Sequence, residues 1–184
     1  MKWGMTLNDS IKTKKIILTG LFAAIICLTT AYILHIPVGA NAGYVHIGDA
    51  LIYMAAALLP TPYAMIAASI GAGMADFLTG AAVWMIPTMI IKPILVLFIS
   101  SKCDKIINTK NVIGSLVAGI IGMVLYMIAE GIMFGNFLAA FTFTAIGLVQ
   151  PIGSFIVFIL LGISFDKLGL KDKLEIIKKE KNSR

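Results

Sequence analysis

Long apolar runs separated by short polar segments dominate the chain. The first run, from Ile16 to Leu34, carries no charged residue, and a helix of this length crosses the roughly 30 Å hydrocarbon core of a bilayer. Five more apolar runs follow it. The pattern therefore predicts an all-α integral membrane protein, a bundle of six transmembrane helices. The expected helices cover residues 16–34, 47–59, 63–78, 82–99, 112–134 and 141–163.

Polar connections set the ends of these helices. Between the first and second, the segment from His35 to His46 has the glycine, proline and asparagine content of an irregular loop. Pro60 and Pro62 end the second helix, which is short for a full span. The lysine-rich tail, residues 166–184, is expected to form a short amphipathic or frayed helix.

The composition supports a membrane protein and argues against a separate soluble domain and against a nucleic-acid-binding protein. Hydrophobic residues make up 59% of the chain and charged residues 13%, against roughly 25% charged residues in soluble domains. We therefore expect residues 1–184 to form a single membrane domain. The net charge of +6 does not indicate nucleic-acid binding, because the basic residues lie in three segments between apolar runs instead of on one surface.

The positions of Lys and Arg test the number of spans. Six spans place four lysines before the first helix, Lys102, Lys105 and Lys110 after the fourth, and seven basic residues of the tail on one side of the membrane. The other side receives none. Lys92 remains inside a span. Because basic residues concentrate on the cytoplasmic side, both termini are predicted to be cytoplasmic.

Four ionisable residues interrupt the predicted spans: Asp49, Asp76, Lys92 and Glu130. Such residues are costly in lipid and usually face a bundle interior or a cavity, so they are candidates for function. Counting residues from the helix ends places all four in the outer half of the membrane or near its midplane. Polar and aromatic residues nearby would suit a small ligand with a flat ring. The candidate substrate-binding residues are Asn41, Tyr44, His46, Asp49, Trp84, Lys92, Tyr126, Glu130 and Gln150.

A structural interpretation of the same residues stays open. Lys92 could neutralise Asp76 or Glu130 in a buried pair that holds the bundle together. Asp49 and Asp76 could cap a helix or reach the interface, and Trp84 could be an interfacial anchor, as could Tyr44. Residue by residue, we favour the structural role for Asp49 and Asp76 and the functional role for Lys92 and Glu130.

Rows of small residues predict where helices pack closely within lipid. On the third and fifth predicted helices the rows suggest internal packing. The row on the first helix could face another subunit instead. The three rows are Ala64, Ala68 and Ala72; Gly114, Ala118 and Gly122; and Gly20, Ala23, Ala24 and Cys27.

Common catalytic motifs are missing from the sequence. It contains no Walker phosphate loop, no His-Glu-x-x-His and no Gly-x-Ser-x-Gly, and its two cysteines are too few for a thiolate metal site. We therefore expect no catalytic residues, no metal and no cofactor, and we predict a binding protein that is not an enzyme. The alternatives are a membrane enzyme acting on a lipid-like substrate and a membrane scaffold protein.

Three segments carry a family resemblance: Gly43-Tyr44-Val45-His46-Ile47-Gly48-Asp49-Ala50, Gly71-Ala72-Gly73-Met74-Ala75-Asp76, and Trp84-Met85-Ile86-Pro87-Thr88 with Ile91-Lys92. The chain resembles the substrate-binding (S) components of energy-coupling factor (ECF) transporters, bacterial importers of vitamins and their precursors. It looks closest to the branch with riboflavin-type and hydroxymethylpyrimidine- or pyridoxine-type components.

The resemblance implies a fold, a substrate and partners. It implies six helices in the bacterial plasma membrane and a water-soluble vitamin bound with high affinity from outside, beneath the loop between the first two helices. It also implies a complex with a transmembrane coupling protein and two ATPase subunits. The family's small-residue docking row on the first helix corresponds here to Gly20, Ala23, Ala24 and Cys27.

Overall fold

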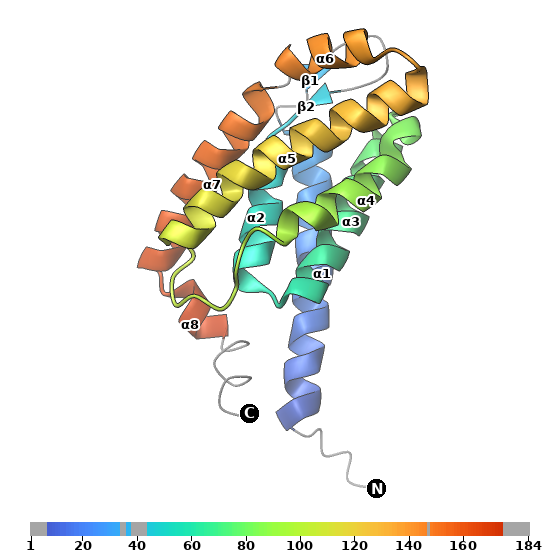
Figure 1. Cartoon of the computed structure of the whole chain (residues 1–184). Helices are drawn as coiled ribbons and strands as arrows, with labels where there is room; N and C mark the ends of the chain where they lie inside the picture. The colour runs from blue at the N-terminus through green and yellow to red at the C-terminus, as the bar shows by residue number, and fades with distance from the viewer. Residues whose placement is uncertain (1–6, 34–35, 38–43, 147, 175–184) are drawn as a thin grey trace, which may run out of the picture.

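The computed structural model describes residues 7–33, 36–37, 44–146 and 148–174, and most of them are helical. The longer helices run along the molecule (Figure 1). A two-residue ladder joins β1 and β2 in antiparallel register. In order, the elements are α1 (Leu7–Tyr32), β1 (Ile36–Pro37), β2 (Tyr44–Val45), α2 (Asp49–Leu58), α3 (Thr61–Leu78), η1 (Ala82–Trp84), α4 (Met85–Val96), α5 (Thr109–Phe134), α6 (Phe137–Ile146), α7 (Val149–Lys167) and α8 (Leu170–Leu174).

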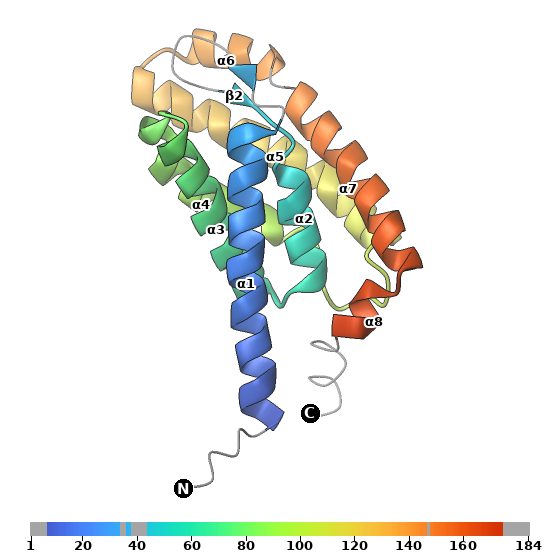
Figure 2. The ribbon, with the colours of Figure 1, turned by 180° about the vertical axis from the view of Figure 1, so that it is seen from behind.

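The two ends of the bundle differ in the elements that they carry. α6 and the β1–β2 ladder lie at one end, called here the α6 end, and the start of α1 lies with α8 at the other, called the α8 end (Figures 1 and 2). The first turns of α1 extend past the rest of the bundle at the α8 end. The elements are thus divided between two ends that can face different sides of a membrane.

α2 forms the centre of the bundle, and its alanine-rich sequence explains why. Nine of its ten residues are buried, so the helix packs on all sides. Pro60 lies at the cap before α3, and Pro62 falls in the first turn of α3, where the missing N–H of proline breaks no helical hydrogen bond. The turn between α2 and α3 is therefore short and sharp.

The predicted small-residue rows on α3 and α5 are internal, as expected. Ala64, Ala68 and Ala72 on α3 are fully buried, as is Ala118 on α5. A Cβ atom added at Gly71 would lie 2.5 Å from the backbone oxygen of Ala23, so α1 and α3 approach almost backbone to backbone. Close packing of this kind holds helices together where lipid removes the hydrophobic driving force.

α4 contains Pro93 in its interior, and the neighbouring helix compensates for it. Proline cannot donate to the carbonyl four residues earlier, which here belongs to Met89. The hydroxyl of Ser69 on α3 donates to that carbonyl oxygen at 2.9 Å. The polar backbone atom freed by Pro93 is therefore satisfied within the bundle, as burial in a membrane requires.

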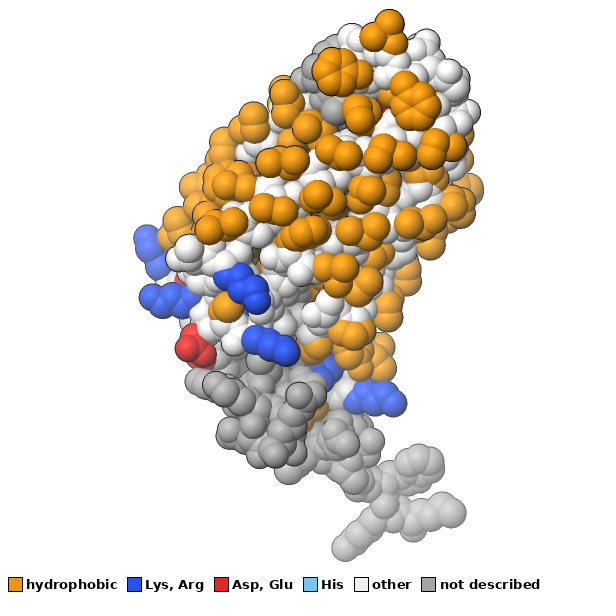
Figure 3. Space-filling view, viewed as in Figure 1, with side chains coloured by type: hydrophobic (Ala, Val, Ile, Leu, Met, Phe, Trp, Pro, Cys, Tyr) orange, Lys and Arg blue, Asp and Glu red, His pale blue; other side chains and the backbone are white. Residues whose placement is uncertain are grey.

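The face of the bundle seen in Figure 3 is apolar over most of its length, and many large hydrophobic side chains are exposed. Three helical segments are long and apolar enough to cross a membrane: Ser10–Tyr32, Thr109–Phe134 and Val149–Lys167. Two shorter apolar segments, Asp49–Leu58 and Ala82–Val96, accompany them. The arrangement is that of a multi-pass membrane protein.

The predicted helix over 141–163 is wrong as a single helix. The chain forms α6 and then α7, and Pro151 lies in the first turn of α7. In one continuous helix the ring of Pro151 would clash with the carbonyl four residues earlier, so the helix must begin anew close to this proline.

Other boundaries also differ from those expected. α1 begins at Leu7 instead of Ile16, because its polar first turns continue the helix beyond the apolar run. α4 ends at Val96, before the expected residue 99. The segment expected to be irregular contains the β1–β2 ladder. α8 accounts for part of the expected tail helix, and the rest of the tail lies outside the described residues.

Candidate functional site

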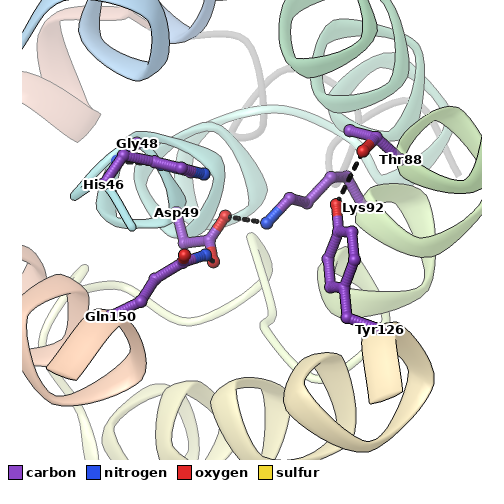
Figure 4. A network of polar contacts seen from close by, with 7 residues as sticks. All are labelled: His46, Gly48, Asp49, Thr88, Lys92, Tyr126 and Gln150. Atoms are coloured by element: carbon purple, nitrogen blue, oxygen red, sulfur yellow. Dashed lines mark hydrogen bonds and ion pairs between the residues drawn. The ribbon is translucent and has the colours of Figure 1, made fainter. Parts of the chain in front are cut away.

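A buried ion pair joins α2 to α4 near the α6 end. The ammonium of Lys92 donates to one carboxylate oxygen of Asp49 at 2.5 Å, and the two residues are 1% and 4% exposed. The amide of Gln150 on α7 donates to the other oxygen of Asp49 at 2.9 Å. The carboxylate of Asp49 therefore connects three helices from distant parts of the sequence (Figure 4).

The start of α2 fixes the position of Asp49. The backbone N–H of Gly48 donates to Nδ1 of His46 at 2.9 Å, so this imidazole nitrogen is an acceptor. A Cβ atom at Gly48 would collide with the hydroxyl oxygen of Thr30 on α1, which explains the glycine at this position. His46 is 5% exposed. Close packing against α1 thus holds the first turn of α2 and presents Asp49 to Lys92.

Aromatic side chains adjoin the ion pair. The ring of Tyr126 on α5 lies 5.0 Å from the Lys92 ammonium, and its hydroxyl donates to the hydroxyl oxygen of Thr88 at 2.9 Å. Trp84 lies at tilted angles to Tyr126 and Phe134, with ring centroids 5.9 Å and 6.0 Å apart. Such a group combines flat apolar faces with a few fixed polar atoms, which is what a site for a ring compound requires.

One face of α4 supplies three of these residues. Trp84 ends η1, and Thr88 and Lys92 follow at intervals of four, so all three side chains lie on the same side of the helix. That side faces Tyr126 on α5 and Asp49 on α2. The arrangement can bind and orient a small molecule. Among the described residues, no group of three or more His, Cys, Asp or Glu side chains comes together in a way that could hold a metal ion.

A sequence model of the family described as "ECF-type riboflavin transporter, S component" matches residues 10–167. The chain belongs to this family. As an S component, it is the substrate-binding subunit of an ECF importer for a vitamin. S components work with an ECF module of coupling and ATPase subunits. No curated protein and no solved structure matches the chain.

The S component brings together most of the residues selected from its sequence. Asp49, Lys92 and Gln150 form one hydrogen-bonded chain, with Tyr126 against Lys92 and Trp84 against Tyr126. The ion-pair partner seen for Lys92 is Asp49, a residue for which the sequence had favoured capping or contact with the interface.

Two further candidate residues lie on α3 and α5, and two cannot be placed. Glu130 lies half-buried on α5, one turn beyond Tyr126. Asp76 is buried on α3, within electrostatic reach of Tyr126. Asn41 and the side chain of Tyr44 lie outside the described residues.

Sequence reasoning missed two participants, Thr88 and Phe134. Thr88 had a visible signal, because it lies midway between Trp84 and Lys92 at helical spacing. Phe134 had none, since it is one of ten phenylalanines in the chain and no spacing relates it to Trp84. Its role depends on how α5 lies against η1.

The small residues of α1 separate into two sets. Gly20 and Ala24 are exposed, and a Cβ atom at Gly20 would meet nothing within 4 Å. Ala23 and Cys27 are half-buried, and Ala23 packs against α3. Only Gly20 and Ala24 therefore leave a close approach open to another helix.

Proposed function

We propose that this S component binds riboflavin or a similar flat heteroaromatic vitamin at the α6 end. The observation that carries the proposal is the contact of Trp84 with both Tyr126 and Phe134, directly beside the Asp49–Lys92 pair. Aromatic faces stack on a conjugated ring, and fixed donors and acceptors select its substituents. The family description, which names riboflavin, supports the same substrate class.

The polar groups of the site already satisfy one another. Lys92 donates to Asp49, Gln150 donates to Asp49, and Tyr126 donates to Thr88. A ligand that forms hydrogen bonds with these groups must first break the internal hydrogen bonds. The number of bonds formed then has to match the number broken. Neutral amide-like edges of a heteroaromatic ring carry both donors and acceptors, so they suit this exchange.

The proposed topology has six spans within a single membrane domain in the bacterial plasma membrane. It places both termini in the cytoplasm and the α6 end outside, where the vitamin arrives. The distribution of lysines supports this orientation.

Uptake is proposed to require a transmembrane coupling protein and two ATPase subunits. The exposed pair Gly20 and Ala24 on α1 is the proposed docking row, since small residues four apart let a second helix approach closely. Ala23 and Cys27, which were also candidates, are half-buried, and Ala23 packs against α3 instead.

A binding titration tests the substrate. Purified protein is titrated with riboflavin while flavin fluorescence is followed, with pyridoxine and hydroxymethylpyrimidine as competitors. We expect saturable quenching that Trp84→Leu weakens by about 30-fold, because a central aromatic contact contributes about 2 kcal/mol. Phe77→Leu is the matched control, since Phe77 is an exposed aromatic residue on α3.

The competitors separate the possible failures. If pyridoxine or hydroxymethylpyrimidine binds and riboflavin does not, the vitamin differs from the one proposed, but the proposed site stands. Unchanged affinity in Trp84→Leu would move the site away from the aromatic group. Absence of binding for all three compounds would contradict the proposed substrate class.

A further inference from the structure

The loop between α4 and α5, at the α8 end, is built as a fixed surface. Asn111, which is fully buried, donates from its amide to the carbonyl oxygens of Ser100 and Ile106 and accepts from the N–H of Ser100. Asn108 caps α5 by accepting from the N–H of Asn111 at 3.0 Å. These bonds hold both ends of the loop to the start of α5.

Asp166 on α7 fastens the same loop from the other side. Its two carboxylate oxygens accept from the N–H groups of Ile106 and Ile107 at 2.8 Å and 2.9 Å. Ile107 also packs closely against Gly162 of α7. The loop, the end of α7 and α8 therefore form one continuous surface, and the charge of Asp166 is engaged with backbone N–H groups.

Lysines outnumber carboxylates on this surface. Six lysines lie between residues 99 and 174, against three aspartates, of which Asp166 is engaged as described. Five of these lysines are exposed, and blue side chains gather in Figure 3 where the apolar surface ends at the α8 end. We call this the basic end surface; its lysines are Lys102, Lys105, Lys110, Lys167, Lys171 and Lys173.

Lys171 differs from the other five. Its ammonium nitrogen is buried, and it donates to no acceptor in the part of the chain that the structure describes. Its electrostatic neighbours are Cys103, Asp166 and Asp104, so it faces the loop. Burial lowers the pKa of Lys171 below its usual value, because desolvation disfavours the charged form. A buried ammonium without an acceptor is costly unless an anion binds to it.

We propose that the basic end surface binds the phosphate of an acidic phospholipid from the cytoplasmic leaflet. The residues that would hold it are Lys171, which faces Cys103 and Asp104, and Lys102 and Lys105, which flank those two residues in the sequence. The inference requires only that the α8 end is cytoplasmic, and it does not depend on which vitamin is bound. The surface adjoins the apolar exterior, so a lipid can place its chains on the bundle and its phosphate on the lysines. Anionic lipids of this leaflet attract juxtamembrane lysines, and charge-assisted hydrogen bonds to phosphate are strong.

The test compares lipids on the full-length protein in detergent. Thermal unfolding is measured after addition of phosphatidylglycerol, phosphatidylcholine or inorganic phosphate. We expect phosphatidylglycerol to raise the melting temperature by about 3 °C or more over phosphatidylcholine, as a ligand that binds only the folded state does. The difference should vanish in Lys102→Gln/Lys105→Gln/Lys171→Met.

Lys12→Gln/Lys14→Gln is the matched control, because these lysines are exposed at the same end but lie on α1, outside the basic end surface. It should keep the full difference between the two lipids. The readout is the difference in melting temperature between the two lipids, measured separately for each variant. A variant of lower overall stability can therefore still show this difference. Equal melting temperatures in both lipids, an equal effect of inorganic phosphate, or an undiminished difference in the triple variant would each overturn the proposal.

Discussion

Asp49 is the residue on which the site depends most. Both of its carboxylate oxygens are engaged, one by Lys92 and the other by Gln150, and all three side chains come from different helices. Inside a membrane protein, an isolated charge costs several kcal/mol, whereas a pair with full hydrogen bonding can persist. Asp49 therefore compensates Lys92 as well as orienting Gln150 toward the site.

The first prediction concerns this pair. Asp49→Asn and Lys92→Met should each destabilise the protein by about 3 kcal/mol or more, because each leaves one buried charge without its partner. The double variant should be less destabilised than the sum of the two, by at least about 2 kcal/mol. Thermal unfolding of the four proteins measures this coupling.

Lys14→Met serves as the control for this cycle, because Lys14 is an exposed lysine on α1, and its stability should stay close to that of the wild type. Additive losses in the double variant would mean that Asp49 and Lys92 do not stabilise each other, and the ion pair would then be incidental to the fold.

Sequence reasoning could find these residues but not their partners. Four charged residues inside apolar runs are visible in the sequence, and their cost in lipid identifies them without a structure. The choice among Asp49, Asp76 and Glu130 as the partner of Lys92 depends on how four helices are arranged. Asp49 and Lys92 are 43 residues apart, and Asp49 and Gln150 are 101 apart, so no local spacing relates them.

At the scale of elements, α1 has two faces with different tasks. Ile26 is fully buried, and Ala23 contacts Gly71 of α3, so this face belongs to the bundle. Gly20 and Ala24 lie on the other face, which is exposed. A bulky residue therefore has opposite consequences on the two faces.

The second prediction uses this difference. Ala24→Leu and Gly20→Leu should leave ligand affinity within about threefold of the wild type but abolish vitamin uptake, because added volume prevents close approach of a partner helix. Ala23→Leu should lower stability, since its side chain would press toward α3. Ligand titration, uptake in cells and co-purification with the coupling protein separate the three effects.

Ser164→Leu is the matched control, an exposed small residue on α7 whose enlargement should change neither binding nor uptake. Normal uptake by Ala24→Leu would show that the exposed row does not dock. Loss of ligand affinity with intact assembly would place the row inside the bundle.

The predicted helix ends agree best with the structure where prolines, glycines or polar residues mark the end of a helix. α2, α3 and α5 begin and end within a few residues of the expected positions, because prolines, glycines and polar segments mark their limits. Hydropathy predicts one helix for α6 and α7, because the apolar run is continuous across the break; the local signal for the break is Pro151. Hydropathy alone does not reveal where a helix changes direction inside an apolar run.

At the scale of the whole molecule, charge is distributed along one axis. In the described residues, every lysine except Lys92 lies on α1 before the apolar run, on the loop before α5 and the start of α5, or on α7 and α8. These segments share the α8 end (Figures 1 and 2). Apart from the buried Lys92, the α6 end carries no lysine among the residues described. Basic residues near membrane helices stay cytoplasmic, so this asymmetry supports the proposed orientation.

The third prediction tests that orientation in cells. In a background with Cys27→Ser and Cys103→Ser, Asn136→Cys should react with an impermeant maleimide on intact cells, because Asn136 is exposed at the start of α6. Lys105→Cys, which is exposed on the loop before α5, should react only after the membrane is permeabilised. As the control for reactivity, the two cysteine variants should be labelled equally by the maleimide in detergent. Labelling of Lys105→Cys on intact cells would place the α8 end outside, and it would remove the ground for a cytoplasmic lipid site at that end.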